Sequence, residues 1–241
     1  MGEVRGVVER ILADPPVVHQ NVRGRPGVWS TDTDCYHFLA EQCASGSRTL
    51  EVGIGLSTVL FASLGSEHTC VTLLEEEATR VRAHCATRGI DDSRLDIVVG
   101  RSDEALPALR PGPLDLFFID GAHGFPAPLV DFHFGARWLR RGGVVVADDL
   151  GLPAPWLLAD FLDLHDQWAQ LHRGPKWGAW RRLDEGPFTV RHFEQPFLNR
   201  PWLPPHTSIV DEARHLAARV RTGLRVRAAR GLGRLGRGRR P

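Results

Sequence analysis

The chain has 241 residues, of which 42% are hydrophobic and 24% charged, and its formal net charge is +1. This composition is that of an ordinary globular protein, and the sequence contains no apolar run of about 18 residues that would predict a membrane-spanning helix. The N-terminal residues lack the features of a secretory signal, and the four cysteines form neither a CxxC pair nor a disulfide framework. We therefore expect a cytoplasmic protein with one main domain and reduced thiols.

The first 44 residues predict a helical cap and a linker. Apolar residues recur with helical spacing over residues 1–13, and a linker rich in proline and glycine follows over residues 14–30. A second helix is expected to begin after Thr31 or Asp32 and to run to about Ala44.

Strands and helices then alternate over residues 45–185, which we expect to form the main domain. Short apolar strands are predicted at residues 49–52, 70–74, 95–99, 114–119 and 144–147, separated by helices at residues 57–64, 76–88, 102–109 and 129–139. After a helix at residues 155–165, the segments 168–172 and 177–183 flank a turn and predict an edge hairpin. Apolar strands between helices are typical of a parallel sheet covered on both faces. We predict an α/β fold with a Rossmann-like, doubly wound, mostly parallel seven-stranded sheet and an antiparallel edge hairpin.

The C-terminal part has a different composition. Residues 186–213 are rich in proline and aromatic residues, which predicts loops that pack on the domain. Residues 214–241 hold ten arginines and no acid, which predicts a tail that is helical and then disordered. Contact with a membrane surface is an alternative for this tail, and nucleic-acid contact is not expected. We favour a solvated tail, or one docked on its own or a neighbouring subunit in a homodimer. The 29 arginines against one lysine indicate a GC-rich, bacterial genome.

A glycine-rich loop lies between the first sheet strand and its helix. Gly53 and Gly55 allow a tight turn and the close approach of backbone to a ligand. Glu51 precedes Gly53 by two residues, which suits a ligand with a cationic amino group, such as S-adenosylmethionine. Ser57 stands where a dinucleotide-binding fingerprint has its third glycine. The loop therefore favours S-adenosylmethionine over a dinucleotide, and a glycine-rich turn without a ligand remains the alternative.

Polar residues also follow the second and third predicted strands. Glu75 comes about 20 residues after the first loop glycine, where a carboxylate binds the ribose of a nucleotide, with Glu76 and Glu77 as competing candidates. Ser102 and Asp103 follow the third strand, where they suit either contact with adenine or a helix cap.

Carboxylates end the fourth and fifth predicted strands. Asp120 follows one strand, and Asp148 and Asp149 follow the next. Parallel neighbours bring their carboxyl ends together, and three such carboxylates repel one another unless a cation is present. A divalent ion with oxygen ligands, Mg²⁺ by default, would neutralise them. His123 lies three residues after Asp120, where it is placed to act as a base.

The motifs in this order resemble a known family. TLEVGIGLST, VTLLEEE, VVGRSDEALPAL, FFIDGAHGF and LRRGGVVVADD are similar to the motifs of class I S-adenosylmethionine-dependent methyltransferases. Within that family, the closest resemblance is to metal-dependent O-methyltransferases that carry an IDGxH motif, such as catechol O-methyltransferase. The resemblance covers about residues 45–150.

The resemblance implies roles for these residues. Asp120, Asp148 and Asp149 would bind the metal, and His123 would act as general base beside Asp120. The cofactor, S-adenosylmethionine, would be bound by residues of the loop and the strand ends: Glu51, Gly53, Gly55, Ser57, Glu75, Ser102, Asp103 and Asp120.

The expected reaction is transfer of a methyl group to a hydroxyl of a small molecule or sugar, with help from a divalent metal. The nature of the acceptor stays open, N-acceptors included. Two other functions also remain open. One is a nicotinamide-dependent oxidoreductase on a similar sheet, and the other is a catalytically silent binding protein with a methyltransferase-like fold.

Overall fold

The computed structural model describes residues 2–20 and 23–186 of the chain. These residues belong to one compact unit, Met1–Val190. The second unit, Arg191–Pro241, lies outside the described residues, and with it most of the expected C-terminal loops and the whole arginine-rich tail. In the part of the chain that the structure describes, none of the helices has the length and apolar character needed to span a membrane.

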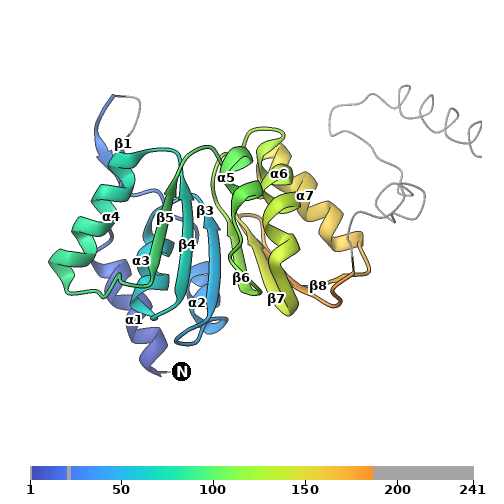
Figure 1. Cartoon of the computed structure of the whole chain (residues 1–241), viewed down its shortest axis with the longest axis horizontal. Coiled ribbons are helices and arrows are strands. Elements are labelled where there is room, and N and C mark those ends of the chain that lie inside the picture. The colour runs from blue at the N-terminus through green and yellow to red at the C-terminus, as the bar shows by residue number, and fades with distance from the viewer. Residues whose placement is uncertain (1, 21–22, 187–241) are drawn as a thin grey trace, which may run out of the picture. The chain divides into compact units, whose positions relative to one another are not determined.

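A seven-stranded sheet runs through the described unit in the order β5-β4-β3-β6-β7-β9-β8 (Figure 1). Its strands are β3 (Arg48–Val52), β4 (Glu67–Thr72), β5 (Leu95–Val99), β6 (Leu114–Ile119), β7 (Leu139–Ala147), β8 (Trp168–Arg173) and β9 (Gly178–Arg182). The first five strands pair in parallel, whereas β9 pairs antiparallel with both β7 and β8. The predicted fold is confirmed, including the hairpin at the edge of the sheet.

Helices cover both faces of this sheet. One face packs against α1 (Gly2–Ala13), α2 (Thr33–Glu41), α3 (Leu56–Ser63) and α4 (Glu75–Arg88). The other face packs against α5 (Ser102–Ala108), α6 (Ala127–Gly135) and α7 (Pro153–Leu164). The expected N-terminal helices therefore share one hydrophobic cluster with the sheet.

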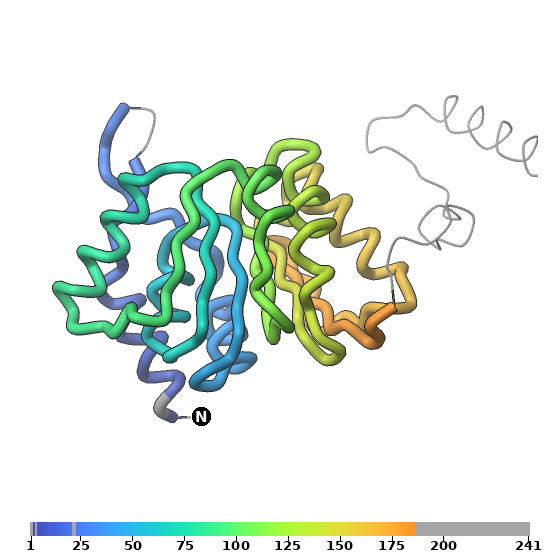
Figure 2. The backbone as a smooth tube through the Cα atoms, viewed as in Figure 1, coloured from blue at the N-terminus to red at the C-terminus, as the bar shows by residue number. Residues whose placement is uncertain are grey.

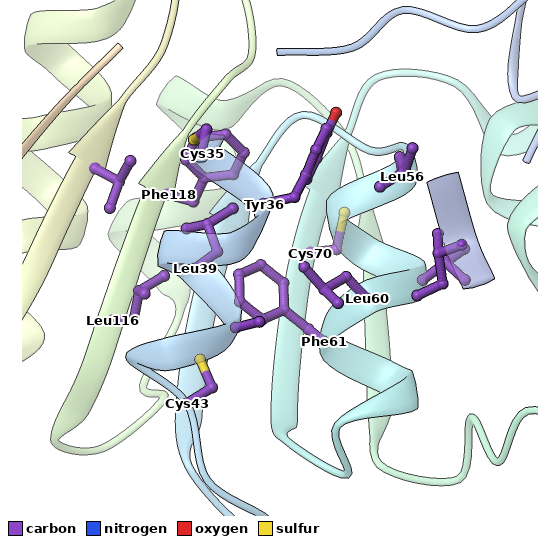
Figure 3. Close-up of a cluster of buried hydrophobic side chains, with 14 of the residues drawn as sticks. Cys35, Tyr36, Leu39, Cys43, Leu56, Leu60, Phe61, Cys70, Leu116 and Phe118 are labelled. Carbon is purple, nitrogen blue, oxygen red and sulfur yellow. The ribbon is translucent and has the colours of Figure 1, made fainter. Parts of the chain in front are cut away.

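The apolar strands are explained by burial on both faces. In β6, Leu116 and Phe118 point into the cluster under α2 and α3, which Figure 3 shows. Phe117 and Ile119 point into the opposite cluster. Successive side chains of a strand alternate between faces, so a strand covered on both faces needs a continuous apolar run.

The order of the strands reverses at β3 and β6, which pair directly with each other. The chain up to β5 builds one half of the unit, and the chain from β6 onward builds the other half (Figure 2). Ligands of open α/β sheets bind at such a reversal, beyond the carboxyl ends of the strands. The topology alone therefore predicts a ligand site at the carboxyl ends of β3 and β6.

Several boundaries differ from the sequence-based prediction. β4 ends at Thr72 instead of residue 74, so α4 begins directly at Glu75. The helix predicted at residues 129–139 ends at Gly135 and continues as a 3-10 turn, Ala136–Trp138. β7 then begins at Leu139 instead of residue 144, and it includes Gly142 and Gly143. The expected linker contains two short strands, β1 (His19–Gln20) and β2 (Pro26–Gly27).

Gly135 shows how tightly α6 packs on the sheet. A Cβ at this position would lie 2.4 Å from the Phe117 ring, which is fully buried. We predict that Gly135→Ala lowers the free energy of unfolding by about 1–3 kcal/mol, because ring and helix must move apart. Urea unfolding measures this change.

The matched control is Gly6→Ala in α1, where the added Cβ would lie no closer than 3.5 Å to another heavy atom. That change should be neutral or should stabilise the protein by about 0.5–1 kcal/mol, because alanine favours a helix. Equal effects of the two substitutions would contradict the close packing of α6.

Candidate active site

A cleft of about 630 Å³ opens at the carboxyl ends of the central strands. Its walls come from the segments that follow β3, β4, β5, β6 and β7, from the N-terminal segment around His19 and Trp29, and from Lys176. This volume lies within the range of small-molecule sites, which is about 300–1,000 Å³. The cleft lies at the reversal of strand order.

The glycine-rich loop forms one wall of the cleft and is pressed against the loop after β6. Gly53 has a φ of 101°, and a Cβ there would lie 2.2 Å from the carbonyl oxygen of Asp120. The Gly55 N–H donates to the Thr58 hydroxyl at 3.0 Å, which ties the loop to the first turn of α3. Gly53, Gly55 and Ser57 all line the cleft. The structure thus places these three candidates where the sequence predicted them.

Glu51 lies below the loop and does not line the cleft. It is 1% exposed, and the Ser57 hydroxyl and the Thr58 hydroxyl donate to its two carboxylate oxygens, the latter at 2.7 Å. His68 Nε2 lies 3.2 Å from the same carboxylate. Glu51 is therefore not placed to contact a ligand in the cleft directly. A buried carboxylate needs partners, and here the partners are side chains that brace the loop.

Glu77, and not Glu75, faces the cleft. Glu75 is exposed at the first position of α4, whereas Glu77 lines the cleft and contacts His19 Nδ1 at 3.0 Å. The Thr72 hydroxyl donates to the other Glu77 oxygen at 3.1 Å. Residues two apart on a helix point in nearly opposite directions, so only one of them can face the site. Glu77, one of the competing candidates, is therefore better placed than Glu75 for a ribose contact.

The far end of the cleft is polar. Ser102 and Asp103 line it, and Arg101 donates to Asp103 with Nη2 at 2.7 Å, which lowers the pKa of that exposed carboxyl. Asp131 on α6 also lines this end, and no motif in the sequence predicted its position there. Asp131 is fully buried, and no hydrogen bond of normal geometry reaches either of its oxygens from the described residues. Burial raises its pKa to about 6, and the nearby Ser102 hydroxyl opposes part of the shift.

The three predicted aspartates meet at the opposite end. The Asp120 N–H donates to the Val52 carbonyl at 2.9 Å, and the Asp148 N–H donates to the Ile119 carbonyl at 3.1 Å, so both extend the parallel ladder. Burial raises the pKa of Asp120 well above its usual value, and the charges of Asp148 and Glu51 add to this shift. Asp149 has a φ of 55°, a left-handed conformation that aspartate tolerates better than most residues. The prediction that these carboxylates converge is confirmed.

Side chains from distant parts of the chain hold this acid cluster, Asp120, Asp148 and Asp149. The Thr31 hydroxyl donates to Asp148 at 2.6 Å, and His123 Nε2 lies 2.9 Å from Asp149. Lys176 contacts both Asp148 and Asp149. Although burial lowers the pKa of Lys176, its bonds to Asp149 and Asp148 outweigh that effect and raise the pKa above its usual value. The lysine is therefore charged, and the cluster already contains a cation of its own.

The donor atoms fit a divalent ion. Single donor atoms of Asp120, His123 and Asp149 all lie within 4.8 Å of one another. Carboxylate oxygens are preferred ligands of Mg²⁺, and imidazole is common among transition-metal ligands. Asp148 is not part of this close group, and its two oxygens are engaged by Thr31 and Lys176.

Sequence reasoning missed the contribution of the N-terminal segment. The His19 ring stacks on Trp29 with a centroid distance of 4.5 Å, and both residues line the cleft. Tyr36 packs its ring in the hydrophobic core and points its hydroxyl away from the buried hydrophobic side chains (Figure 3). It too lines the cleft. Their positions depend on tertiary packing that no local pattern reveals.

The raised pKa of Asp131 predicts a specific dependence of stability on pH. The folded-state pKa of about 6 exceeds the ordinary value of 3.8, so ionisation of Asp131 opposes folding. This cost grows as the pH rises from the lower value to the higher one. We predict that Asp131→Asn stabilises the ligand-free protein more at pH 8 than at pH 5, by about 1 kcal/mol. Urea unfolding at both pH values measures the difference.

The control for Asp131 is Asp96→Asn, at an exposed position on β5. Its effect on the free energy of unfolding should be the same at both pH values. If Asp131→Asn shows no dependence on pH either, the carboxyl is not desolvated in the way described.

Comparisons with known proteins agree with this geometry. Residues 50–150 match a family described as a methyltransferase domain. The catechol O-methyltransferase of Mycobacterium tuberculosis is 33% identical over 108 residues, which is 43% of this chain and 48% of that protein. The chain thus matches about half the length of this relative.

Solved structures share the fold at lower identity. A candidate O-methyltransferase from Klebsiella pneumoniae is 17% identical with a TM-score of 0.57, and the match covers 73% of this chain and 90% of that one. An S-adenosylhomocysteine-bound methyltransferase from Podospora anserina is 14% identical with a TM-score of 0.53, covering 75% and 88% of the two chains. A cofactor-bound protein from MTB has the same TM-score, 0.53, at 20% identity, covering 76% and 89%. Residues 50–150 thus match a methyltransferase-domain family, part of the chain is similar to a catechol O-methyltransferase, and the solved structures share the fold.

Proposed function

We propose that this chain transfers a methyl group from S-adenosylmethionine to a hydroxyl of a small molecule or sugar. One observation carries the proposal. One side of a single cleft is lined by the glycine-rich loop, by Glu77 and by the polar end with Ser102 and Asp103. The other side is lined by His123 and the acid cluster. The cofactor-bound and S-adenosylhomocysteine-bound proteins that share the fold support the choice of cofactor.

The cleft suggests an orientation for the cofactor. The adenine would lie at the polar end, between Ser102 and Asp103 on one side and Asp131 on the other. The ribose hydroxyls would donate to Glu77. The methionine part would reach the loop at Gly53 and Gly55, where the N-terminus of α3 begins. Because Glu51 is buried below this loop, Asp120 is the carboxylate left to bind the amino group.

The acceptor hydroxyl would lie beside His123. His123 Nε2 lies 2.9 Å from an Asp149 oxygen, and the carboxylate would stabilise the positive charge that appears when the ring takes a proton. His123 Nδ1 is then the atom that removes the proton from the acceptor hydroxyl, whose oxygen attacks the sulfonium methyl. General-base assistance of this kind contributes about 10²–10⁴-fold.

A divalent cation is part of this proposal. Asp120, Asp148 and Asp149 would hold it, and His123 would lie beside it as the base. When bound, it would supply Lewis-acid stabilisation of the acceptor oxyanion. The similarity to catechol O-methyltransferase supports this role.

The ribose contact can be tested with the two competing glutamates. Glu77→Ala should weaken binding of S-adenosylhomocysteine by about 10–100-fold, because hydrogen bonds to a charged group are lost. Glu75→Ala, two residues away and exposed, should leave the affinity unchanged. Isothermal titration calorimetry measures both values, and the opposite ranking would restore Glu75 as the ribose ligand.

The role of His123 as general base can be tested by the rate of methyl transfer. His123→Ala should lower the rate of methyl transfer by about 10²–10⁴-fold, because the acceptor stays protonated. Release of S-adenosylhomocysteine, followed with a panel of catechols, other phenols and sugars, measures the rate. Cofactor affinity should stay within about twofold of the wild-type value, since His123 serves the acceptor.

His133→Ala is the control for this experiment, since His133 is exposed on α6 and does not line the cleft. Its rate should match that of the wild type. If His123→Ala instead abolishes cofactor binding and leaves turnover per bound cofactor normal, the base assignment fails.

A further inference from the structure

Lys176 is the only lysine of the chain. It lies in the turn between β8 and β9, and its ammonium group reaches the end of β7. Lys176 Nζ is 3.2 Å from Asp148 Oδ2 and also contacts Asp149 Oδ1. The edge hairpin therefore delivers one positive charge to two of the three proposed metal ligands.

The contacts of Lys176 complete a closed set of partners. Thr31 donates to Asp148 Oδ1, and His123 Nε2 contacts Asp149 Oδ2. With Lys176 on the remaining two oxygens, each carboxylate oxygen of Asp148 and Asp149 has a partner within the protein. A divalent cation binds through such oxygens and repels a nearby ammonium group. Binding of the ion to these carboxylates is therefore disfavoured while Lys176 stays in contact with them.

Hydrogen bonds hold the backbone around Lys176, whereas its side chain is partly exposed to solvent. The Leu150 N–H, just past the acid pair, donates to the Lys176 carbonyl at 2.8 Å. The Gly174 N–H donates to the Trp177 carbonyl at 2.9 Å and closes the turn. The Lys176 side chain remains 31% exposed, and its four-carbon stem allows the ammonium group to move into solvent.

We propose that Lys176 is a tethered counter-ion that competes with the divalent cation for Asp148 and Asp149. Without the metal, it neutralises the repulsion within the acid cluster. Metal binding displaces it, so the site needs a higher metal concentration than its carboxylates alone would require. This inference rests on the proposed metal site, and it adds a regulating residue that the turn of the edge hairpin supplies.

Mn²⁺ is the probe for the test, because the paramagnetic resonance signal of free aqueous Mn²⁺ is lost on binding. Titration of the full chain should show that Lys176→Met binds Mn²⁺ at least about tenfold more tightly than the wild type, because a neighbouring positive charge is removed. Lys176→Gln should act in the same direction, which covers the case in which one variant folds poorly. Lys176→Arg keeps the charge and should stay within about threefold of the wild type.

Arg181→Met is the matched control. Arg181 is an exposed cation on the same hairpin, but it pairs with Val144, toward the opposite end of β7 from Lys176. Its loss should leave Mn²⁺ affinity within about twofold of the wild type, because a distant exposed charge is screened. An equal gain for Arg181→Met would mean that general charge, and not the position of Lys176, sets the affinity.

Thermal unfolding gives a second readout. In EDTA, Lys176→Met should unfold at a lower temperature than the wild type, because the acid cluster has lost its cation, and Mn²⁺ should raise its unfolding temperature more than that of the wild type. Unchanged or weaker Mn²⁺ binding by Lys176→Met would overturn the proposal, as would the absence of binding by both proteins. Calorimetry with S-adenosylhomocysteine on the same samples separates this failure from failure of the proposed function, since cofactor binding does not depend on the competition.

Discussion

The close contact between the loops after β3 and β6 is the constraint on which the candidate site depends. Gly53 has no room for a side chain beside the Asp120 carbonyl, and a Cβ on Gly121 would lie 2.6 Å from Val52 Cγ1. Glycine on both loops allows their backbones to touch. This contact places the nucleotide-type loop directly beside the first residue of the acid cluster. Larger residues at either position would separate the two walls of the cleft.

The site also gathers negative charge that must be compensated. Glu51 is compensated from below by hydroxyl groups and His68, so its charge braces the loop. Asp148 and Asp149 are compensated by Thr31, His123 and Lys176. Burial and the neighbouring carboxylates raise the pKa of Asp120. A cationic ligand or a divalent ion would favour its ionised form, so both the cofactor and the metal suit this end of the cleft.

Local sequence patterns predicted most of the scaffold. A continuous apolar run such as β6 has few alternatives in a chain of this composition, and the residues that follow such runs must lie at one edge of the sheet. This is why Asp120, Asp148 and Asp149 could be brought together from the sequence. The loop glycines were predictable for the same reason, since their spacing is set by the tight turn.

The remaining residues depend on distances that the sequence does not encode locally. Glu75 and Glu77 lie on opposite sides of α4, so the point at which the helix begins decides which of them faces the cleft. β4 ends at Thr72, two residues earlier than expected, and α4 then begins at Glu75, with Glu77 facing the cleft. The hydroxyl partners of Glu51 are Ser57 and Thr58, which lie in the first turn of α3. Lys176 and Thr31 reach the acid cluster from an antiparallel hairpin and from the segment before α2. Their placement follows from tertiary packing and from the order of strands in the sheet, which the hydrophobic periodicity of the sequence does not predict.

The central claim is that the cleft binds S-adenosylmethionine. Isothermal titration calorimetry of the full chain with S-adenosylhomocysteine tests it most directly, with NADH as the competing nucleotide. We expect saturable binding of one S-adenosylhomocysteine per chain and no measurable heat with NADH. Binding of NADH without binding of S-adenosylhomocysteine would contradict the account and would identify the cleft as a dinucleotide site.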